Sequence, residues 1–361
     1  MKTLKTIVSA AALTLSASAM AQSQPFDYNV DRFADIEVLR YQVPDFESLT
    51  LNQKRLVYYL TEAALWGRDI LWDQNYKYNL PLRQMIEGVY SNYSGDRNSA
   101  DFKAFENYLK QVEFANGIHH HYSMDKFTPG FSREWLEAEV AKLGQGAWTP
   151  VQTEVMAAIF DPSVAAKRVN QAEGEDLILT SANNLYEGVT QQEVEDFYAA
   201  KKDPNDATPV SYGLNARVTK KDGKVVEQIY KLDGLYSEAI ARIVENLAKA
   251  MAYAENDNQR MTIARLIDYY TTGDLATFDD YSIRWTEDTA SQVDFINGFI
   301  ESYGDPLGMT GSWESIVNFK NIPASHRTEV LSQNAQWFEN NSPVDPRFRK
   351  EAVKGVSAKV I

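Results

Sequence analysis

The sequence has 361 residues, a length typical of about two domains, and its formal net charge at pH 7 is −14. It contains no cysteine, so its stability must come from a large core or from a metal rather than from disulfides. Because a chain this acidic repels phosphate backbones, nucleic acid is excluded as a favoured partner, whereas cationic ligands such as peptide N-termini are favoured.

The first 21 residues predict a secretory signal peptide. Lys2 and Lys5 form a positive start, residues 7–15 form a short apolar run, and the small residues of AMA at 19–21 are typical of a cleavage site before Gln22. The run is much shorter than the ~20 residues of a membrane-spanning helix. We therefore expect a mature chain that starts near Gln22, in a bacterial-type periplasm or outside the cell. The alternative is a frayed helical N-terminus.

The first half of the mature chain is predicted to be mainly helical. Thr50 and Gln53 have the spacing of a capping box, and apolar residues recur at helical spacing from there to about Trp72. Thr190 and Glu193 form a second capping box, which opens a helix to about residue 202. Further helical patterns cover residues 79–93, 101–113 and 132–143, and residues 150–160 carry apolar side chains four positions apart.

Residues 210–232 change character and predict a β-hairpin. Residues 210–218 and 225–232 are strand-like, and Asp222-Gly223 between them is a turn signal, since both central residues of a tight turn favour positive φ. Helical patterns then return, at 235–256, 258–272, 275–285, 287–303 and about 325–340. The sequence therefore predicts an α+β fold that is mostly helical.

The last residues, KGVSAKVI, have the pattern of the start of a strand. No turn, cap or polar tail follows them, and a strand needs a partner. We therefore expect the sequence to end in mid-domain.

A histidine cluster, GIHHHY at 117–122, is the most conspicuous group of candidate metal ligands. In an extended segment His119 and His121 share one face and His120 points away. Two imidazoles on one face are short of the three or four ligands that zinc needs, and His326 is the one other histidine. The sequence favours histidines that hydrogen-bond backbone and side chains in a loop over a metal site.

A second candidate is the carboxylate of Glu301. The predicted helix at 287–303 places Asp294, Asn297 and Glu301 along one stripe, which is the pattern of an ordinary solvated face. The functional interpretation is a carboxylate at the rim of a cleft, paired with an α-ammonium, while Tyr303 donates to a peptide carbonyl. Charge-assisted hydrogen bonds of this kind are strong. The spacing alone leaves both interpretations open.

The stretch FIESYGDPLGMTGSWES at 299–315 resembles the substrate-cleft segment of the dipeptidyl peptidase III family. Members of that family carry a Glu-Ser-Tyr-x-Asp-Pro-x-Gly run and a further Glu eleven residues after the Tyr. Here these are Glu301 to Gly308, and Glu314. Other segments look like the bacterial, Bacteroides-like branch of the family and extend the resemblance over nearly all of the mature chain: NGIHHHY, KFTPGF, FDPSVAAKRVNQAEGEDLILTSANN, TPVSYGLN and SAKVI.

The resemblance implies a zinc exopeptidase that removes dipeptides from the N-termini of oligopeptides, and the predicted signal peptide adds that it is secreted. It implies two lobes around a wide cleft, one lobe mostly helical and metal-bearing, the other with a β-barrel core. Glu301 would anchor the substrate's N-terminal ammonium, Tyr303 would hydrogen-bond the substrate backbone, and Glu314 would be a supporting acid. A zinc-bound water, with a glutamate as general base, would attack the scissile carbonyl.

One departure from the family pattern limits what this chain is expected to do. The HExxGH and EExRAD-type motifs that supply the family's zinc ligands and the paired asparagines of its substrate site are absent from the sequence. We therefore expect the N-terminal part of such an enzyme, with no catalytic residues, no bound zinc and no peptidase activity of its own. The expected parts are a signal peptide at 1–21, a substrate-binding lobe with a partial β-barrel at 22–321, an entry into the helical lobe at 322–352, and the start of a core strand at 353–361.

Two other functions remain open from the sequence. One is a non-catalytic module that binds peptide N-termini, with no metal at any stage. The other is an unrelated acidic helical scaffold. Peptides are the expected partners in the first case, and no oligomeric state is predicted.

Overall fold

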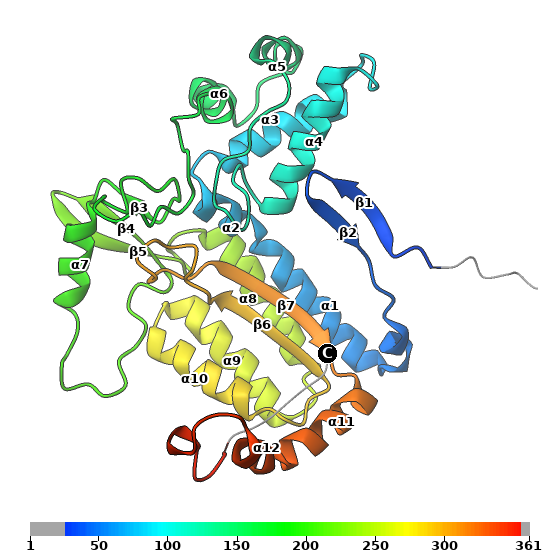
Figure 1. The fold of residues 1–361 in the computed structure, drawn as a ribbon, viewed down its shortest axis with the longest axis vertical. Helices are drawn as coiled ribbons and strands as arrows, with labels where there is room; N and C mark the ends of the chain where they lie inside the picture. The colour runs from blue at the N-terminus through cyan, green and yellow to red at the C-terminus, as the bar shows by residue number, and fades with distance from the viewer. Residues whose placement is uncertain (1–25, 355–361) are drawn as a thin grey trace, which may run out of the picture. The chain divides into compact units, whose positions relative to one another are not determined.

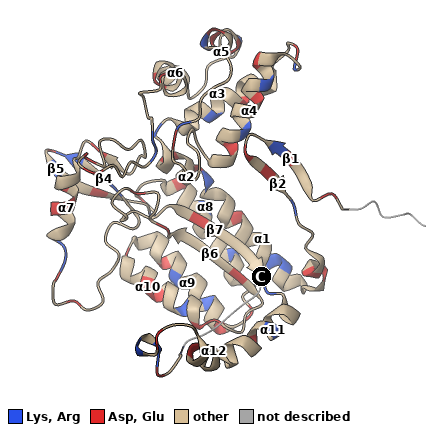
Figure 2. Ribbon diagram, viewed as in Figure 1, with Lys and Arg blue, Asp and Glu red and all other residues tan. Residues whose placement is uncertain are grey.

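The computed structural model describes residues 26–354, which fall into two compact units with the boundary between Val43 and Pro44. The predicted signal peptide at 1–21 and most of the predicted final strand at 353–361 lie outside the described residues. Figure 1 traces the chain and labels its elements. Lys and Arg residues are interspersed with Asp and Glu along most elements (Figure 2), so the negative charge does not come from a single acidic tract.

The first unit contains one small antiparallel sheet, which the sequence analysis did not predict. Strand β1 (Asn29–Phe33) pairs with β2 (Ile36–Leu39), and Phe33 lies opposite Ile36 at the turn. Ala34 in this turn has a φ of 47°, the left-handed conformation of a tight hairpin.

The second unit begins with a short 3-10 turn, Pro44–Ser48, and two helices where the sequence predicted one. Helix α1 (Leu51–Trp66) has the predicted capping box: Thr50 Oγ1 accepts from the Gln53 N–H, and the Gln53 side chain accepts from the Thr50 N–H. Gly67 ends α1, and α2 (Arg68–Asn75) follows at once. The predicted helix to Trp72 is therefore interrupted at Gly67.

Four further helices surround the first large core. These are α3 (Asn79–Asn92), α4 (Ala100–Ala115), α5 (Arg133–Val140) and α6 (Gln152–Phe160), with a 3-10 turn at Thr149–Val151 before α6. Phe102, Phe105, Phe131 and Trp135 form a chain of ring contacts in or beside this core, with centroids 5.3–6.2 Å apart. Burial of large rings at helical spacing explains why the sequence pattern predicted these helices.

The predicted β-hairpin is confirmed. Strands β4 (Ala216–Lys221) and β5 (Lys224–Ile229) pair antiparallel around Asp222 and Gly223, whose φ values are 52° and 77°. The short strand β3 (Tyr186–Glu187) adds to β4 in parallel, giving the order β3-β4-β5. Helix α7 (Gln191–Ala199) follows β3 and begins with the second predicted capping box, Thr190 and Glu193.

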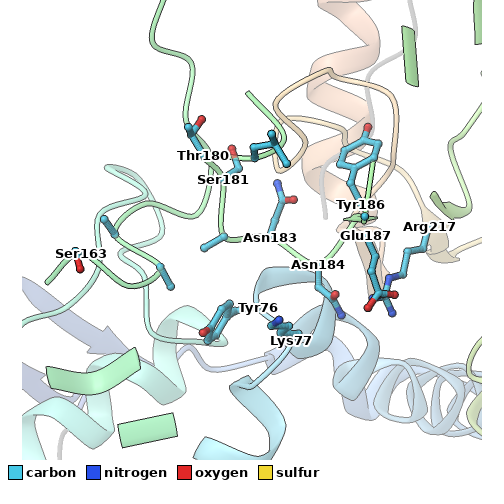
Figure 3. Close-up of a pocket in the computed structure, with 15 residues that line it drawn as sticks. Tyr76, Lys77, Ser163, Thr180, Ser181, Asn183, Asn184, Tyr186, Glu187 and Arg217 are labelled. Carbon is cyan, nitrogen blue, oxygen red and sulfur yellow. The ribbon is translucent and has the colours of Figure 1, made fainter. Parts of the chain in front are cut away.

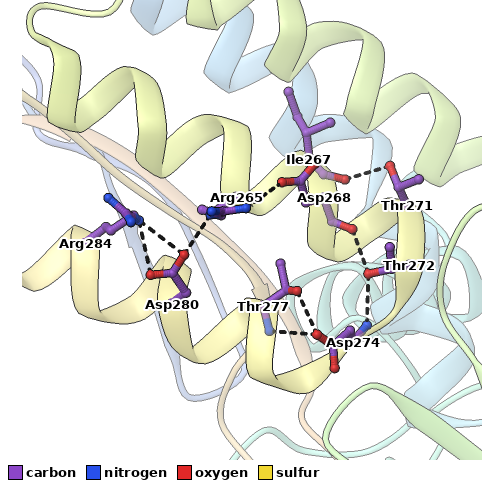
Figure 4. A network of polar contacts seen from close by, with 9 residues as sticks. All are labelled: Arg265, Ile267, Asp268, Thr271, Thr272, Asp274, Thr277, Asp280 and Arg284. Atoms are coloured by element: carbon purple, nitrogen blue, oxygen red, sulfur yellow. Dashed lines mark hydrogen bonds and ion pairs between the residues drawn. The ribbon is translucent and has the colours of Figure 1, made fainter.

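A second core is built by α1 together with α8 (Ser237–Met251), α9 (Asp257–Thr272) and α10 (Leu275–Glu287). Figure 4 shows the polar network that joins α9 to α10: Arg265 pairs with Asp280 at 2.7 Å, and Arg284 pairs with the same carboxylate at 3.1 Å. Asp274 caps the start of α10 by accepting from the Thr277 N–H.

The predicted helix at 287–303 is wrong. After α10, strand β6 (Val293–Phe299) pairs antiparallel with β7 (Trp313–Phe319). The buried side chains alternate along β6, with Val293, Phe295, Asn297 and Phe299 on one face. Period-two burial against a paired strand therefore prevails over the helical spacing of the same apolar residues.

The polar stripe expected at Asp294, Asn297 and Glu301 does not exist as such. Asn297 is 1 % exposed and accepts from the Tyr270 hydroxyl, whereas Asp294 accepts from Trp285 Nε1 at 2.9 Å. Adjacent positions of a strand point to opposite faces, so Asp294 and Asn297 diverge. Glu301 lies beyond the end of the strand.

The described chain ends with α11 (Ile322–Gln333), α12 (Ala335–Asn341) and a 3-10 turn at Pro346–Phe348, so the helix predicted at 325–340 is divided at Asn334. The α+β class is confirmed. The strands between residues 26 and 354 form sheets of two or three strands, and they close no barrel. No helix in that range combines the length and apolar character needed to cross a membrane.

Candidate functional site

The candidate site is the loop between β6 and β7. Two of the predicted substrate-binding residues, Glu301 and Tyr303, lie in this loop, and the third, Glu314, is the second residue of β7. The strand ladder continues into it: the Ile300 N–H donates to the Ser312 carbonyl at 3.1 Å, and the Ser312 N–H donates to the Glu301 carbonyl at 2.8 Å. The backbone of Glu301 is therefore fixed by the sheet, even though its side chain is exposed.

Asp305 organises the loop from inside. Its carboxylate is 1 % exposed and accepts hydrogen bonds from the Leu307, Met309 and Thr310 N–H groups at 2.7–3.0 Å. The Tyr186 hydroxyl of β3 donates a fourth, at 2.7 Å. Burial raises the pKa of Asp305, and the four hydrogen bonds oppose that rise.

Two amide side chains fasten the loop to the rest of the unit. Gln74 of α2 donates to the Gly311 carbonyl at 3.0 Å and accepts from the Trp313 N–H at 2.8 Å, so its buried amide completes two backbone hydrogen bonds. Asn183 donates to the Gly304 carbonyl at 3.1 Å. The loop is thus held at both of its ends and at its middle.

Trp313, the first residue of β7, packs into the break between α1 and α2. A Cβ added to Gly67 would lie 2.0 Å from Trp313 Cζ2, so only glycine leaves room for the indole there. The indole Nε1 donates to the Tyr270 hydroxyl at 3.2 Å. This contact sets the position of β7 and of Glu314, the next residue along it.

Glu301 and Glu314 lie close enough for their charges to interact. Glu314, opposite Gly298 in the β6–β7 ladder, is half-buried. Burial raises the pKa of Glu314, and the negative charge of Glu301 raises it further. Across residues 26–354 neither carboxylate has an ion pair or a side-chain hydrogen bond. The site is therefore a pair of carboxylates to which the described part of the chain supplies no cation.

Tyr303 faces a different neighbourhood. Its side chain is 60 % exposed and lines a pocket of about 490 Å³, together with Met124, Lys167 and others. Burial lowers the pKa of the Arg168 guanidinium, and the proximity of Tyr303 opposes that lowering. No hydrogen bond joins Tyr303 to Glu301 or Glu314 in the described chain. The structure brings the two carboxylates together and places the phenol on the wall of a neighbouring hollow.

Comparisons with known proteins decide the family. Residues 177–355, which include the whole β6–β7 loop, match Peptidase family M49. Dipeptidyl peptidase 3 from Dictyostelium discoideum is 34 % identical over 130 residues, and its Homo sapiens counterpart is 35 % identical over 118 residues. This chain belongs to the dipeptidyl peptidase III family.

Solved structures of the family share the fold. Dipeptidyl peptidase III from Caldithrix abyssi matches 85 % of this chain with a TM-score of 0.57 and 18 % identity, and the enzyme from Corallococcus sp. strain EGB matches 88 % with a TM-score of 0.56 and 16 % identity. The match covers 47 % of each of those chains, and the two sequence matches cover 18 % of the Dictyostelium protein and 16 % of the human protein. The chain thus spans about half the length of the solved dipeptidyl peptidase III structures. The Bacteroides-like branch stays a prediction.

The zinc that the family resemblance implies does not fit the residues described. No group of three or more His, Cys, Asp or Glu side chains in the described ranges is arranged to hold a metal ion. The described residues of this member of the dipeptidyl peptidase III family therefore offer no ligand set for a zinc ion.

The histidine cluster stabilises a loop through hydrogen bonds, as predicted. His119 is 1 % exposed, and its Nε2 lies 2.8 Å from the Ala165 carbonyl oxygen. His120 Nδ1 accepts from the Tyr122 and Ser123 N–H groups, each at 3.1 Å. Burial lowers the pKa of His119 to about 4, so the ring is neutral at pH 7.

The predicted geometry of the cluster is wrong in one respect. His120 does not point away from His121: their rings stack with centroids 4.5 Å apart, because the chain turns at 121–123 instead of staying extended.

Sequence reasoning missed the residues that hold the site together, Gln74, Asn183 and the buried role of Asp305. The Asp-Pro-x-Gly pattern is a turn signal that points to Asp305 as a loop organiser. Gln74 and Asn183 carry no comparable local signal, because their partners lie 237 and 121 residues away.

Proposed function

We propose that this chain forms the wall that binds the substrate N-terminus in a secreted, zinc-dependent dipeptidyl peptidase that removes dipeptides from oligopeptides. The observation that carries the proposal is the pair of interacting carboxylates, Glu301 and Glu314, without a cation of their own among the described residues. Two such charges lower the free energy of an ammonium group placed between them.

A dipeptide-releasing enzyme must cleave at a fixed distance from the substrate's free N-terminal ammonium, so it needs a group that binds that ammonium. Glu301 binds that ammonium and Glu314 supports it from the adjacent strand. An acetylated or extended N-terminus leaves both carboxylates with their mutual repulsion, and is therefore disfavoured. Because the sheet fixes the backbone of Glu301, the position at which the ammonium binds is also fixed.

Tyr303 contributes the second contact. Its exposed phenol donates a hydrogen bond to a carbonyl of the bound peptide, near the second residue. Asp305 and Asn183, through the loop they hold, keep Tyr303 on the wall of its pocket.

Within this proposal, residues 1–21 direct export and are removed, residues 22–321 form the substrate-binding lobe, and residues 322–352 enter the helical lobe. The zinc and its chemistry come from sequence motifs that this chain lacks. We therefore expect the 361-residue chain to bind peptides and to hydrolyse none.

The test is a comparison of one tetrapeptide with its N-acetylated form, by calorimetric titration against the purified chain. Tetra-alanine should bind saturably, and the acetylated peptide should bind at least roughly tenfold more weakly. Equal affinity for the two would contradict the proposal. The same assay followed by mass spectrometry separates a dipeptide-releasing chain from one that only binds.

A further inference from the structure

A second, more polar pocket lies away from the carboxylate pair. It has a volume of about 530 Å³, within the ~300–1,000 Å³ range of small-molecule sites. Its walls come from the Tyr76–Lys77 turn after α2, from residues 163–188, and from Arg217 of β4. Figure 3 shows Tyr76, Lys77 and Asn183 arranged around one space.

Three hydrogen-bond donors on these walls have no acceptor within the described chain. The Lys77 ammonium has no ion pair there, and it lies over the Tyr78 ring, 4.9 Å from the centroid. Burial raises the pKa of Tyr76 to about 12, so its hydroxyl keeps its proton at pH 7. Ser181 Oγ accepts from the Asn170 N–H at 2.8 Å, which leaves its own proton to donate.

Two amide oxygens complement these donors. The Asn183 amide nitrogen donates to the Gly304 carbonyl, and the Asn184 amide nitrogen donates to Asp73 Oδ1, each at 3.1 Å. Because these bonds fix which end of each amide is the nitrogen, the oxygens remain as acceptors for a ligand N–H.

The charges of the pocket walls favour a ligand that carries a single negative charge. Arg217 is paired with Glu187 at 2.8 Å, so those two charges cancel. Lys77 is then the one uncompensated cation among the lining residues. Lys77 balances one negative charge, so the second charge of a doubly charged anion such as phosphate has no partner on these walls, which disfavours it.

We propose that this pocket binds a carboxylate that carries a neighbouring amide N–H, the chemistry of a peptide C-terminus or an N-acylated amino acid. The carboxylate accepts from Lys77 and Tyr76, which Figure 3 shows on the same side of Asn183, and the amide N–H donates to Asn183 or Asn184. The site is separate from the one proposed for peptide N-termini, since its ligand needs no free amine.

The pocket shares two residues with the β6–β7 loop. Asn183 holds the Gly304 carbonyl, and Tyr186, whose ring also lines the pocket, holds Asp305. A ligand that fixes Asn183 therefore also restrains the loop that carries Tyr303, so occupancy of this pocket is coupled to the N-terminus site.

The test uses N-acetylalanine, which has the carboxylate and the amide but no ammonium, in a ligand-observed NMR titration of the 361-residue chain. We expect saturable binding that N-acetylalanine amide, which lacks the carboxylate, fails to reproduce within a tenfold higher concentration. Lys77→Met should weaken binding at least fivefold. Lys202→Met, which removes the same charge from an exposed position after α7, should leave it unchanged.

Three results would overturn the proposal: absence of saturation, equal binding of the amide analogue, or equal binding to the Lys77→Met protein. Displacement of N-acetylalanine by an equal concentration of inorganic phosphate would also overturn it, because the pocket would then be a general anion site. Glu301→Gln should not change N-acetylalanine binding, so failure here and failure of the proposed function are distinguishable.

Discussion

The hydroxyl of Tyr186 donates a 2.7 Å hydrogen bond to the buried carboxylate of Asp305, which lies 119 residues later in the chain. The same carboxylate accepts three backbone N–H groups of its own loop. This one contact therefore joins the three-stranded sheet to the loop that presents Tyr303. It makes the loop geometry a property of the whole unit rather than of the local sequence.

Asp305→Asn should lower the free energy of unfolding by roughly 3 kcal/mol, because an amide nitrogen would face backbone donors in a buried site. Tyr186→Phe should cost less, about 1–2 kcal/mol, since the three backbone hydrogen bonds remain. Urea unfolding of the three proteins measures both effects. Equal stability of wild type and Asp305→Asn would show that the carboxylate does not hold the loop.

Gly67→Ala should destabilise the chain by about 1–3 kcal/mol, because the new methyl group would overlap the Trp313 ring. Gly144→Ala is the matched control: a Cβ there meets nothing within 4 Å, so stability should stay the same or rise by up to about 1 kcal/mol. Thermal unfolding of both variants gives the comparison. A Gly67→Ala protein as stable as the control would mean that the indole moves aside at no cost.

His119 should make stability depend on pH between about 6.5 and 4. The folded protein holds the pKa at about 4, below the unfolded value of 6.5, so the unfolded state takes up the proton first as the pH falls. The contribution is complete above pH 6.5 and up to about 3 kcal/mol of it is lost by pH 4. His119→Gln keeps a donor for the Ala165 carbonyl without titrating.

The measurement is the difference in unfolding free energy between wild type and His119→Gln at several pH values. That difference should change across the window from pH 6.5 to 4 and stay level above it. A constant difference would show that His119 titrates alike in both states.

Glu314 should release protons when a peptide ammonium binds. Its pKa is raised by burial and by the charge of Glu301, and a bound cation offsets that repulsion and lowers the pKa. At acidic pH, calorimetric enthalpies for a free-amine peptide should therefore differ between buffers of different ionisation enthalpy. Glu314→Gln should remove the difference, and its persistence in that variant would assign the protons to another group.

Features encoded by a few adjacent residues could be predicted from the sequence. The Asp222-Gly223 turn and the capping boxes at Thr50 and Thr190 depend on neighbours within four positions, and the structure contains each of them. The prediction of a helix at 287–303 was wrong because Val293 and Phe299 fit the apolar spacing of a helix and that of a strand at once. Pairing with β7 decided between them, and no local signal reveals that partner.

The candidate site likewise has residues that the sequence could indicate and residues that depend on distant partners. Glu301 and Tyr303 were candidates from their own stretch of sequence, the family resemblance favoured their functional roles and added Glu314, and all three roles stay predictions. The buried Asn297, which broke the apolar pattern of β6, is tolerated because Tyr270 and Ser315 satisfy its amide across the fold. Such long-range hydrogen bonds define the site but leave no periodic trace in the sequence.

The most direct test of the central claim is the effect of Glu301→Gln on the preference of the chain for free over acetylated N-termini. Glu287→Gln is the control, since it removes the same charge from an exposed residue before β6, whereas Glu301 follows the strand. In calorimetric titrations with tetra-alanine, Glu301→Gln should weaken binding roughly tenfold and bring it to the level of the acetylated peptide, and Glu287→Gln should change nothing. An unchanged preference in the Glu301→Gln protein would contradict the account.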